Sequence, residues 1–194
     1  MPPSIHGEQE GDYAFNWWND AFTAEERISM EVAFNPLGEI TAKDLALSLN
    51  PSSIGNLIGH FKKIHLREVG YKLIARADTL VSEEVPVLSR HFYFASRGNY
   101  YYRWRDLDSF ALEEAIESFY RQIDLAGCAL ECFRKDEGLG FIPAHAGYRQ
   151  LRIIEEKRGN FKLARELCKK AMTEGWSDDW GLQIARLNKK LGVA

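Results

Sequence analysis

Cysteine is scarce in this sequence: its 194 residues include three, Cys128, Cys132 and Cys168. An odd number of cysteines in helical surroundings argues against a disulfide framework and favours a reducing, cytoplasmic location. Long apolar runs are also missing, because no stretch approaches the ~18 residues that a membrane span needs. The N-terminus has no basic, apolar secretion signal. We therefore expect a cytoplasmic protein that has no disulfides and does not cross a membrane.

An excess of charge of one sign is absent as well. The chain carries 25 Lys and Arg residues against 28 Asp and Glu residues, so its formal net charge is −3 at pH 7. This balance supplies little attraction for nucleic acid or for an acidic membrane. Prolines number six, whereas hydrophobic residues make up 45% of the chain, which is enough to form a packed core.

Strand patterns are missing too. No apolar–polar alternation runs beyond four residues, and no Asn-Gly or Asp-Gly pair marks a hairpin. Apolar residues instead recur at helical spacing, which predicts an all-α chain. We divide this chain into a flexible N-terminus (residues 1–12), an N-terminal helical region (13–85) and a region of helical hairpins (86–194).

The N-terminal region contains clear helix starts. Thr23 followed by Glu26 is a capping-box pattern, and Thr41 followed by Asp44 is a second such signal. The first helix carries Ile28, Val32 and Ala33 on one side and ends before Pro36, since proline disfavours helix at the preceding residue. Two further helices are predicted from apolar residues at helical spacing: Ile54, Leu57, Ile58 and Phe61, then Val69, Leu73, Ala77 and Leu80.

The C-terminal region reads as a series of longer helices. The pattern predicts one helix over residues 87–106, a single long helix over 110–135 and another with Pro143 in its first turn, ending at Arg158. Gly159 can take a left-handed conformation, so we expect it to form the turn before a helix that opens at Phe161. Ser177 is the expected N-cap of the last helix.

The last hairpin resembles the tetratricopeptide repeat, whose period is about 34 residues. The similar positions are Tyr148, Leu151, Gly159, Phe161, Ala164, Cys168 and Ala171. A looser repeat precedes it, with Gly98, Tyr101, Tyr102, Ala115 and Phe119 at comparable places. The resemblance covers roughly residues 88–191. The chain as a whole is similar to bacterial proteins with tetratricopeptide-like repeats. It implies antiparallel hairpins stacked as a right-handed array, with an N-terminal helical extension and a C-terminal capping helix.

The resemblance also implies a concave groove lined by the first helices of successive repeats. Its residues here are Arg97, Asn99, Tyr100, Arg103, Trp104, Arg149, Ile153, Glu156 and Lys157. Cations beside an amide suit an acidic or C-terminal peptide, which accepts charge-assisted hydrogen bonds. We therefore expect a non-catalytic interaction module that binds a protein or peptide partner.

Other interpretations stay open. A helix with two aromatic faces, such as the one over residues 87–106, can instead be buried on both sides. The chain is then a structural or oligomerising domain, with a second copy as its partner. Arginines interleaved with aromatics also suit unpaired bases, and a small-molecule site between the two regions is a third alternative.

Chemical motifs give no further lead. Cys128 and Cys132 lie one helical turn apart and fit small core residues better than metal ligands. The sequence contains no phosphate-binding loop, nucleophile elbow or convincing carboxylate pair. It therefore nominates no catalytic residue, metal or cofactor.

Overall fold

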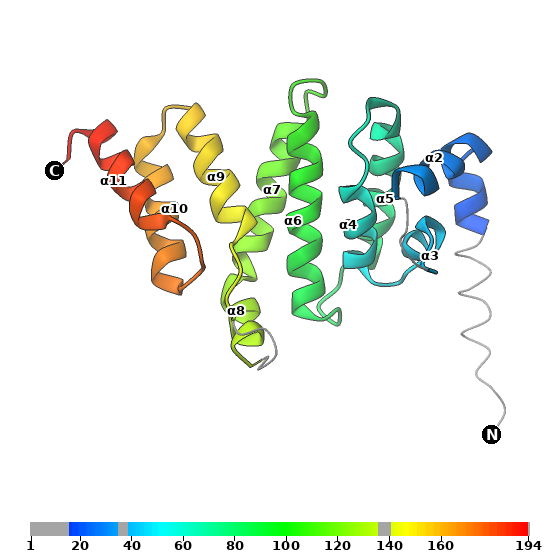
Figure 1. The fold of residues 1–194 in the computed structure, drawn as a ribbon, viewed down its shortest axis with the longest axis horizontal. Helices are drawn as coiled ribbons and strands as arrows, with labels where there is room; N and C mark the ends of the chain where they lie inside the picture. Colours follow the sequence, from blue (N-terminus) through cyan, green and yellow to red (C-terminus); the bar gives the residue numbers. More distant parts are fainter. Residues whose placement is uncertain (1–15, 35–38, 136–140, 194) are drawn as a thin grey trace. The chain divides into compact units, whose positions relative to one another are not determined.

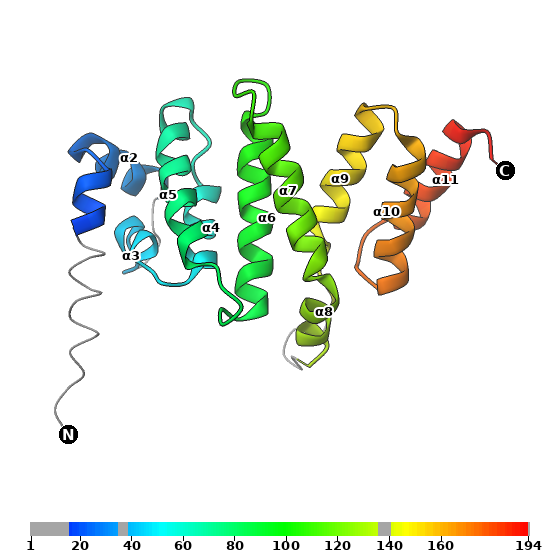
Figure 2. The ribbon, with the colours of Figure 1, turned by 180° about the vertical axis from the view of Figure 1, so that it is seen from behind.

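The computed structural model describes residues 16–34, 39–135 and 141–193. Every regular element in these ranges is a helix and none is a strand, which confirms the all-α class. The chain divides into two compact units, Met1–Val85 (unit 1) and Pro86–Ala194 (unit 2). Figures 1 and 2 show the helices of each unit from opposite sides. The flexible N-terminus expected over residues 1–12 lies outside the described ranges.

The helices of unit 1 begin at side-chain caps that the sequence predicts. After a helical stretch over residues 16–21, its elements are α2 (Ala24–Phe34), α3 (Ala42–Ala46), α4 (Pro51–Gly59), a 3₁₀ turn (Ile64–Leu66) and α5 (Arg67–Leu80). The Thr23 amide donates to Glu26 Oε2 at 2.9 Å, and the Glu26 amide donates to Thr23 Oγ1 at 3.2 Å. Thr41 and Asp44 form the same reciprocal pair at α3. Both predicted starts are thus confirmed. The helices begin there because each cap satisfies amides that have no partner inside the helix.

The apolar spacing of α4 and α5 also gives the expected burial. These helices pack against each other, and their buried residues include Ile54, Leu57, Ile58, Val69, Leu73 and Ala77. The helix α2 differs, because it buries Met30 and leaves Ile28 and Val32 65% and 69% exposed. The side of α2 on which the sequence places its aliphatic residues is therefore not its buried side.

Unit 2 is built from longer helices that pack in sequence order. They are α6 (Val87–Trp104), α7 (Ala111–Asp124), α8 (Ala126–Lys135), α9 (Ala146–Lys157), α10 (Phe161–Glu174) and α11 (Trp180–Leu191). Contacts join α6 to α7, α7 to α9, α9 to α10 and α10 to α11. Both ribbon views show this succession from green to red. No helix of the described ranges is long and apolar enough to cross a bilayer.

The prediction of a single long helix over residues 110–135 is wrong. The helix is broken at Leu125, whose amide bonds back to the carbonyls of Gln122 and Ile123. The side chain of Gln122 is held in place from both sides, because Gly147 donates to its oxygen at 2.7 Å and its nitrogen lies 3.1 Å from His91 Nε2. The break lets α8 contact α6 while α7 contacts both α6 and α9.

Two helix starts also differ from the sequence-based expectation. Pro143 is not in the first turn of α9, because His145 is the N-cap and its Nδ1 accepts the Tyr148 amide at 3.3 Å. Ser177 is not the N-cap of α11, which begins at Trp180 after Asp179. The segment before α11 is held differently: Asp178 accepts the Asp179 amide at 2.9 Å and pairs with Arg149.

Glycines shape both hairpins of unit 2. Gly159 has φ 78° and lies between α9 and α10, which confirms the predicted turn. Gly98 lies on α6 where a Cβ atom would come within 2.5 Å of the Phe119 ring on α7. The two helices can approach this closely because residue 98 has no side chain.

Candidate functional site

The groove residues expected on α6 separate into a buried and an exposed set. Arg97, Tyr100 and Trp104 are only 7%, 2% and 6% exposed, whereas Asn99 and Arg103 are exposed. Arg97 donates to Ser118 Oγ and to Glu114 Oε2 on α7, each at 2.6 Å. An arginine removed from water needs such partners, so Arg97 joins α6 to α7. These three side chains do not line an open groove as the sequence predicts.

The groove residues expected on α9 contact neighbouring elements of unit 2. Arg149 Nε donates to Asp178 Oδ2 at 2.8 Å, beside the start of α11. Lys157 Nζ donates to the Tyr102 hydroxyl at 3.2 Å, across to α6. Ile153 between them is half-buried. These side chains of α9 thus reach the segment before α11 and the end of α6.

Glu156 is the centre of an ion cluster. Arg186 on α11 donates to both of its carboxylate oxygens, at 2.7 and 2.5 Å, and Arg152 donates at 2.9 Å. These bonds, from Arg186 first, hold the pKa of Glu156 at about 2 despite its partial burial. With its oxygens occupied in this way, Glu156 fixes α11 against α9 and has little capacity for a ligand.

A concave site remains where the C-terminal ends of α6 and α9 meet the start of α7. We call it the Tyr102 pocket. It encloses about 240 Å³ and is lined by Tyr102, Arg105, Asp106, Leu112, Ile154, Lys157 and Arg158. Three of these side chains are cationic, one is anionic, and Leu112 and Ile154 supply aliphatic surface. Lys157 is the residue that this pocket shares with the predicted groove.

The cations of the Tyr102 pocket are neutralised to different degrees. Arg105 stacks over the Tyr102 ring at 4.2 Å and pairs at 3.1 Å with Asp106, whose side chain is 79% exposed. Arg158 pairs at 3.1 Å with Glu113, also largely exposed, and at 3.2 Å with Glu155, which is buried. The pairs of Arg105 with Asp106 and of Arg158 with Glu113 are exposed to water, so they contribute little and yield readily to another anion. The pocket is therefore able to accept a carboxylate.

Lys157 has the least neutralised charge in the pocket. Its partner is the neutral hydroxyl of Tyr102, with the ring centroid at 5.7 Å. Within the described part of the chain, no carboxylate oxygen lies within 4.0 Å of its ammonium nitrogen. An ammonium group that is positioned but not paired favours a carboxylate ligand.

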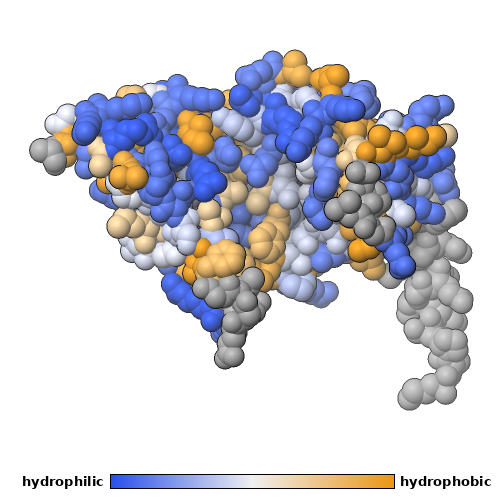
Figure 3. Space-filling view, viewed as in Figure 1, coloured by the Kyte–Doolittle hydropathy of each residue, from blue (hydrophilic) through white to orange (hydrophobic). Residues whose placement is uncertain are grey.

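Charge differs sharply between the two units. Unit 2 contains 18 Lys and Arg residues against 15 Asp and Glu residues, a net charge of +3. Unit 1 contains 7 against 13, a net charge of −6. The surface of unit 2 in Figure 3 is mainly hydrophilic over α9 to α11, with scattered apolar residues. The Tyr102 pocket thus lies on the unit whose field attracts anions.

A buried polar cluster lies elsewhere in unit 2. His91 stacks on Trp176, with ring centroids 5.6 Å apart, and lies 5.0 Å from the His145 ring. Burial lowers the pKa of His91 to about 4. Burial, and next the proximity of His91, lower the pKa of His145 to about 3. Both rings are therefore neutral near pH 7 and belong to the core of the unit.

The cysteines do not follow the predicted pattern. Cys128 is exposed and Cys132 is half-buried, so the expectation that both are core residues is wrong. The buried side of α8 consists of Ala126, Ala129, Leu130 and Phe133, and the two thiols lie away from it. Cys168 is buried, and burial raises the pKa of its thiol to about 11. Within the described residues, no three His, Cys, Asp or Glu side chains gather as metal ligands.

Most of the Tyr102 pocket is absent from the predicted groove. Arg105, Leu112, Ile154 and Arg158 were not expected there. The sequence does contain a signal for this pocket: basic residues stand at the C-terminal ends of α6 and α9. They are Arg105 directly after α6, and Lys157 with Arg158 at the end of α9. Two helices that run in the same direction bring these ends to one edge of the unit.

Comparison with known proteins adds no relative: no family model matches the chain, and neither a curated protein nor a solved structure is significantly similar to it.

Proposed function

We propose that this chain is a non-catalytic interaction module of tetratricopeptide-like hairpins, and that it binds an acidic peptide segment of a partner protein in the Tyr102 pocket. The observation that carries the proposal is the Lys157 ammonium group, held by the Tyr102 hydroxyl at 3.2 Å without a carboxylate partner among the described residues. A peptide carboxylate completes this arrangement through a charge-assisted hydrogen bond.

The surroundings of Lys157 support a peptide rather than a bare anion. Leu112, which is half-buried, offers aliphatic surface beside the cations, which suits an apolar side chain next to an acidic one. Arg105, whose partner Asp106 is exposed, extends the cationic edge, so an adjacent second carboxylate can compete for its guanidinium group. The net charge of unit 2 favours the encounter with an acidic segment.

The hairpins support the tetratricopeptide-like part of the proposal. Gly159 forms the turn between α9 and α10, and Gly98 allows the close approach of α6 and α7. Such units serve as rigid frames that present side chains for recognition. The free, partly exposed thiols suit a reducing compartment, and we place the protein in the cytoplasm.

One observation favours a different role for the aromatic helix. Tyr93, Tyr100 and Trp104 on α6 are buried, which is the pattern of a core helix. In this second candidate function, the chain is a structural or oligomerising domain and its aromatic residues contact no ligand. Both candidates are compatible with burial of Tyr100, but only the first needs Lys157.

Peptide display distinguishes the two candidates. A library of random peptides is selected against the full-length protein, and the enriched peptides are tested against Lys157→Glu and Lys162→Glu. Lys162 is exposed in the first turn of α10 and provides a matched charge reversal outside the pocket. We expect acidic peptides whose affinity falls at least about tenfold in Lys157→Glu and is unchanged in Lys162→Glu. Equal loss in both variants, or no acidic enrichment, would contradict the proposal.

A further inference from the structure

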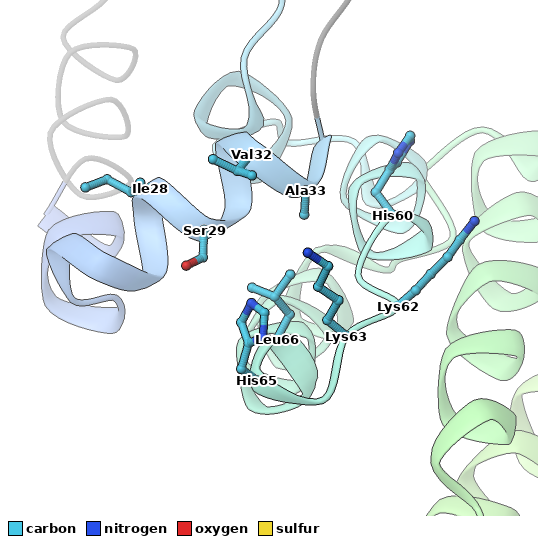
Figure 4. A pocket seen from close by; sticks show the side chains of 9 residues that line it. All are labelled: Ile28, Ser29, Val32, Ala33, His60, Lys62, Lys63, His65 and Leu66. Carbon is cyan, nitrogen blue, oxygen red and sulfur yellow. The ribbon is translucent and has the colours of Figure 1, made fainter.

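A second concave site lies within unit 1, between α2 and the connection that leads from α4 to α5. We call it the α2 groove. It encloses about 350 Å³, and its lining includes Ile28, Val32, His60, Lys62, Lys63 and Leu66. Figure 4 shows α2 along one side of it and residues 62–66 along the other, with Lys63 pointing toward α2 and with Ser29 and Ala33 pointing toward Lys63. Ile28 and Val32 form an aliphatic wall at the rim of the groove on α2, and Lys62 and Lys63 form a cationic wall.

The aliphatic wall is exposed to an unusual degree. Ile28 and Val32 lie one turn apart on α2 and are 65% and 69% exposed, while Met30 on the opposite side is fully buried. One exposed aliphatic residue is ordinary, but two in line beside a hollow mark a surface for apolar contact. Covering them would stabilise a complex through the area removed from water.

The cationic wall has no partner of opposite charge among the described residues. Elsewhere in unit 1, Lys72 pairs with Glu26 at 2.9 Å and Arg67 pairs with Glu68 at 3.0 Å. Lys62 and Lys63 are exposed, and no carboxylate oxygen of the described ranges lies within 4.0 Å of either ammonium group. These lysines retain a local positive charge although unit 1 as a whole carries −6.

We propose that the α2 groove docks an acidic amphipathic segment of a partner protein. Aliphatic side chains of that segment lie on Ile28 and Val32, and its carboxylates face Lys62 and Lys63. Helices of this kind commonly place their apolar stripe in such a groove. This site is independent of the Tyr102 pocket, so one chain can hold two segments at once and gain affinity when both belong to the same partner.

A membrane surface is the weaker occupant on physical grounds. Two lysines contribute only about 1 kcal/mol each at an anionic leaflet, too little for stable attachment by themselves. The site is also hollow, whereas the aliphatic wall of a membrane-binding helix must protrude into the lipid. A peptide fits a concave site with walls of two kinds.

Peptide display on the full-length protein tests this proposal separately from the Tyr102 pocket. Selection uses the Lys157→Glu variant, so that ligands of the Tyr102 pocket are disfavoured. We expect acidic–aliphatic peptides whose affinity falls at least about tenfold on Lys63→Glu and on the double change Ile28→Ser with Val32→Ser. Lys162→Glu serves again as the matched charge reversal and leaves the affinity unchanged.

Three results would overturn the inference. The first is enrichment of no acidic peptide, or of peptides that bind the Lys63→Glu variant as well as the parent. The second is sedimentation of the parent protein with phosphatidylserine–phosphatidylcholine vesicles that is lost in Lys63→Glu, which assigns the groove to a membrane. The third is a dimer in sedimentation velocity that Ile28→Ser with Val32→Ser dissociates, which assigns it to a second copy. Circular dichroism confirms that each variant keeps its helices, since the changed residues are exposed.

Discussion

Lys157 donates to the Tyr102 hydroxyl at 3.2 Å and links the C-terminal end of α9 to that of α6. The two residues are 55 positions apart in the chain, and the contact exists because α6 and α9 end at the same edge of unit 2. The phenol holds the ammonium group in place without neutralising it. A charge that is fixed before the ligand arrives costs less to order on binding, which gives this pair its place in the proposed function.

The turn at Gly159 provides a test of backbone strain alone. A Cβ atom at this position would meet no heavy atom within 4 Å, so substitution creates no clash. With φ at 78°, Gly159→Val should nevertheless lower the free energy of unfolding by on the order of 1 kcal/mol or more. Urea denaturation measures the change. Gly181→Ala in α11 is the control, because it also meets open space at a helical position and should be neutral or stabilising.

Gly98 provides the contrasting case, where space and not φ is limiting. An added Cβ atom would lie 2.5 Å from the Phe119 ring, so α6 and α7 must separate to admit it. Gly98→Ala should therefore destabilise the protein by roughly 1–3 kcal/mol, although alanine is the better helix former. A thermal melt that shows a gain in stability would mean that Phe119 moves aside without cost.

These glycines illustrate how far the sequence alone leads. The turn at Gly159 was predictable because it depends on one residue and its immediate neighbours, and so were the reciprocal caps at Thr23 and Thr41. The break at Leu125 was not, because Gln122 is held there by His91 and Gly147, residues distant in the chain. Apolar spacing alone favours a continuous helix through this point.

The candidate site was less predictable than the fold for the same reason. The pattern correctly places Arg97 and Tyr100 on α6, but not the partner on α7 that occupies Arg97 or the burial of the Tyr100 ring. Only the tertiary arrangement determines which polar side chains are already paired. Lys157 belongs to both the predicted groove and the Tyr102 pocket. It stays available to a ligand because its partner is a neutral hydroxyl.

Acid should weaken the fold through the two buried histidines. The pKa values of His91 and His145 are about 4 and about 3 in the folded state, below the value of 6.5 that applies without burial. As the pH falls below about 6.5, the unfolded chain binds protons that the folded chain does not, so stability is lost. By pH 5, each histidine accounts for about 2 kcal/mol.

Denaturation of variants at pH 7 and pH 5 isolates this effect. His145→Asn keeps a side chain that can cap α9 but removes one titrating group, so it should reduce the loss of stability between the two pH values. His65→Asn, at an exposed position, should leave that loss unchanged. An identical pH dependence in both variants would exclude His145 as a cause.

Cys128 and Cys168 should differ in reactivity. Cys128 is exposed and should react with a thiol reagent such as DTNB in the native protein. Cys168 is buried with its pKa raised to about 11, so it should react only when the protein unfolds. Cys128→Ser should remove the fast phase and Cys168→Ser the slow one. Rapid native labelling of Cys168 would show that α10 is not packed as described.

Peptide affinity at the Tyr102 pocket tests the central claim most directly. Fluorescence polarisation of a selected acidic peptide is compared between the parent protein, Lys157→Glu and Lys162→Glu. The proposed function predicts at least about a tenfold loss for Lys157→Glu, since a favourable charge pair becomes a repulsive one, and no change for Lys162→Glu. Equal affinities of all three proteins would contradict it.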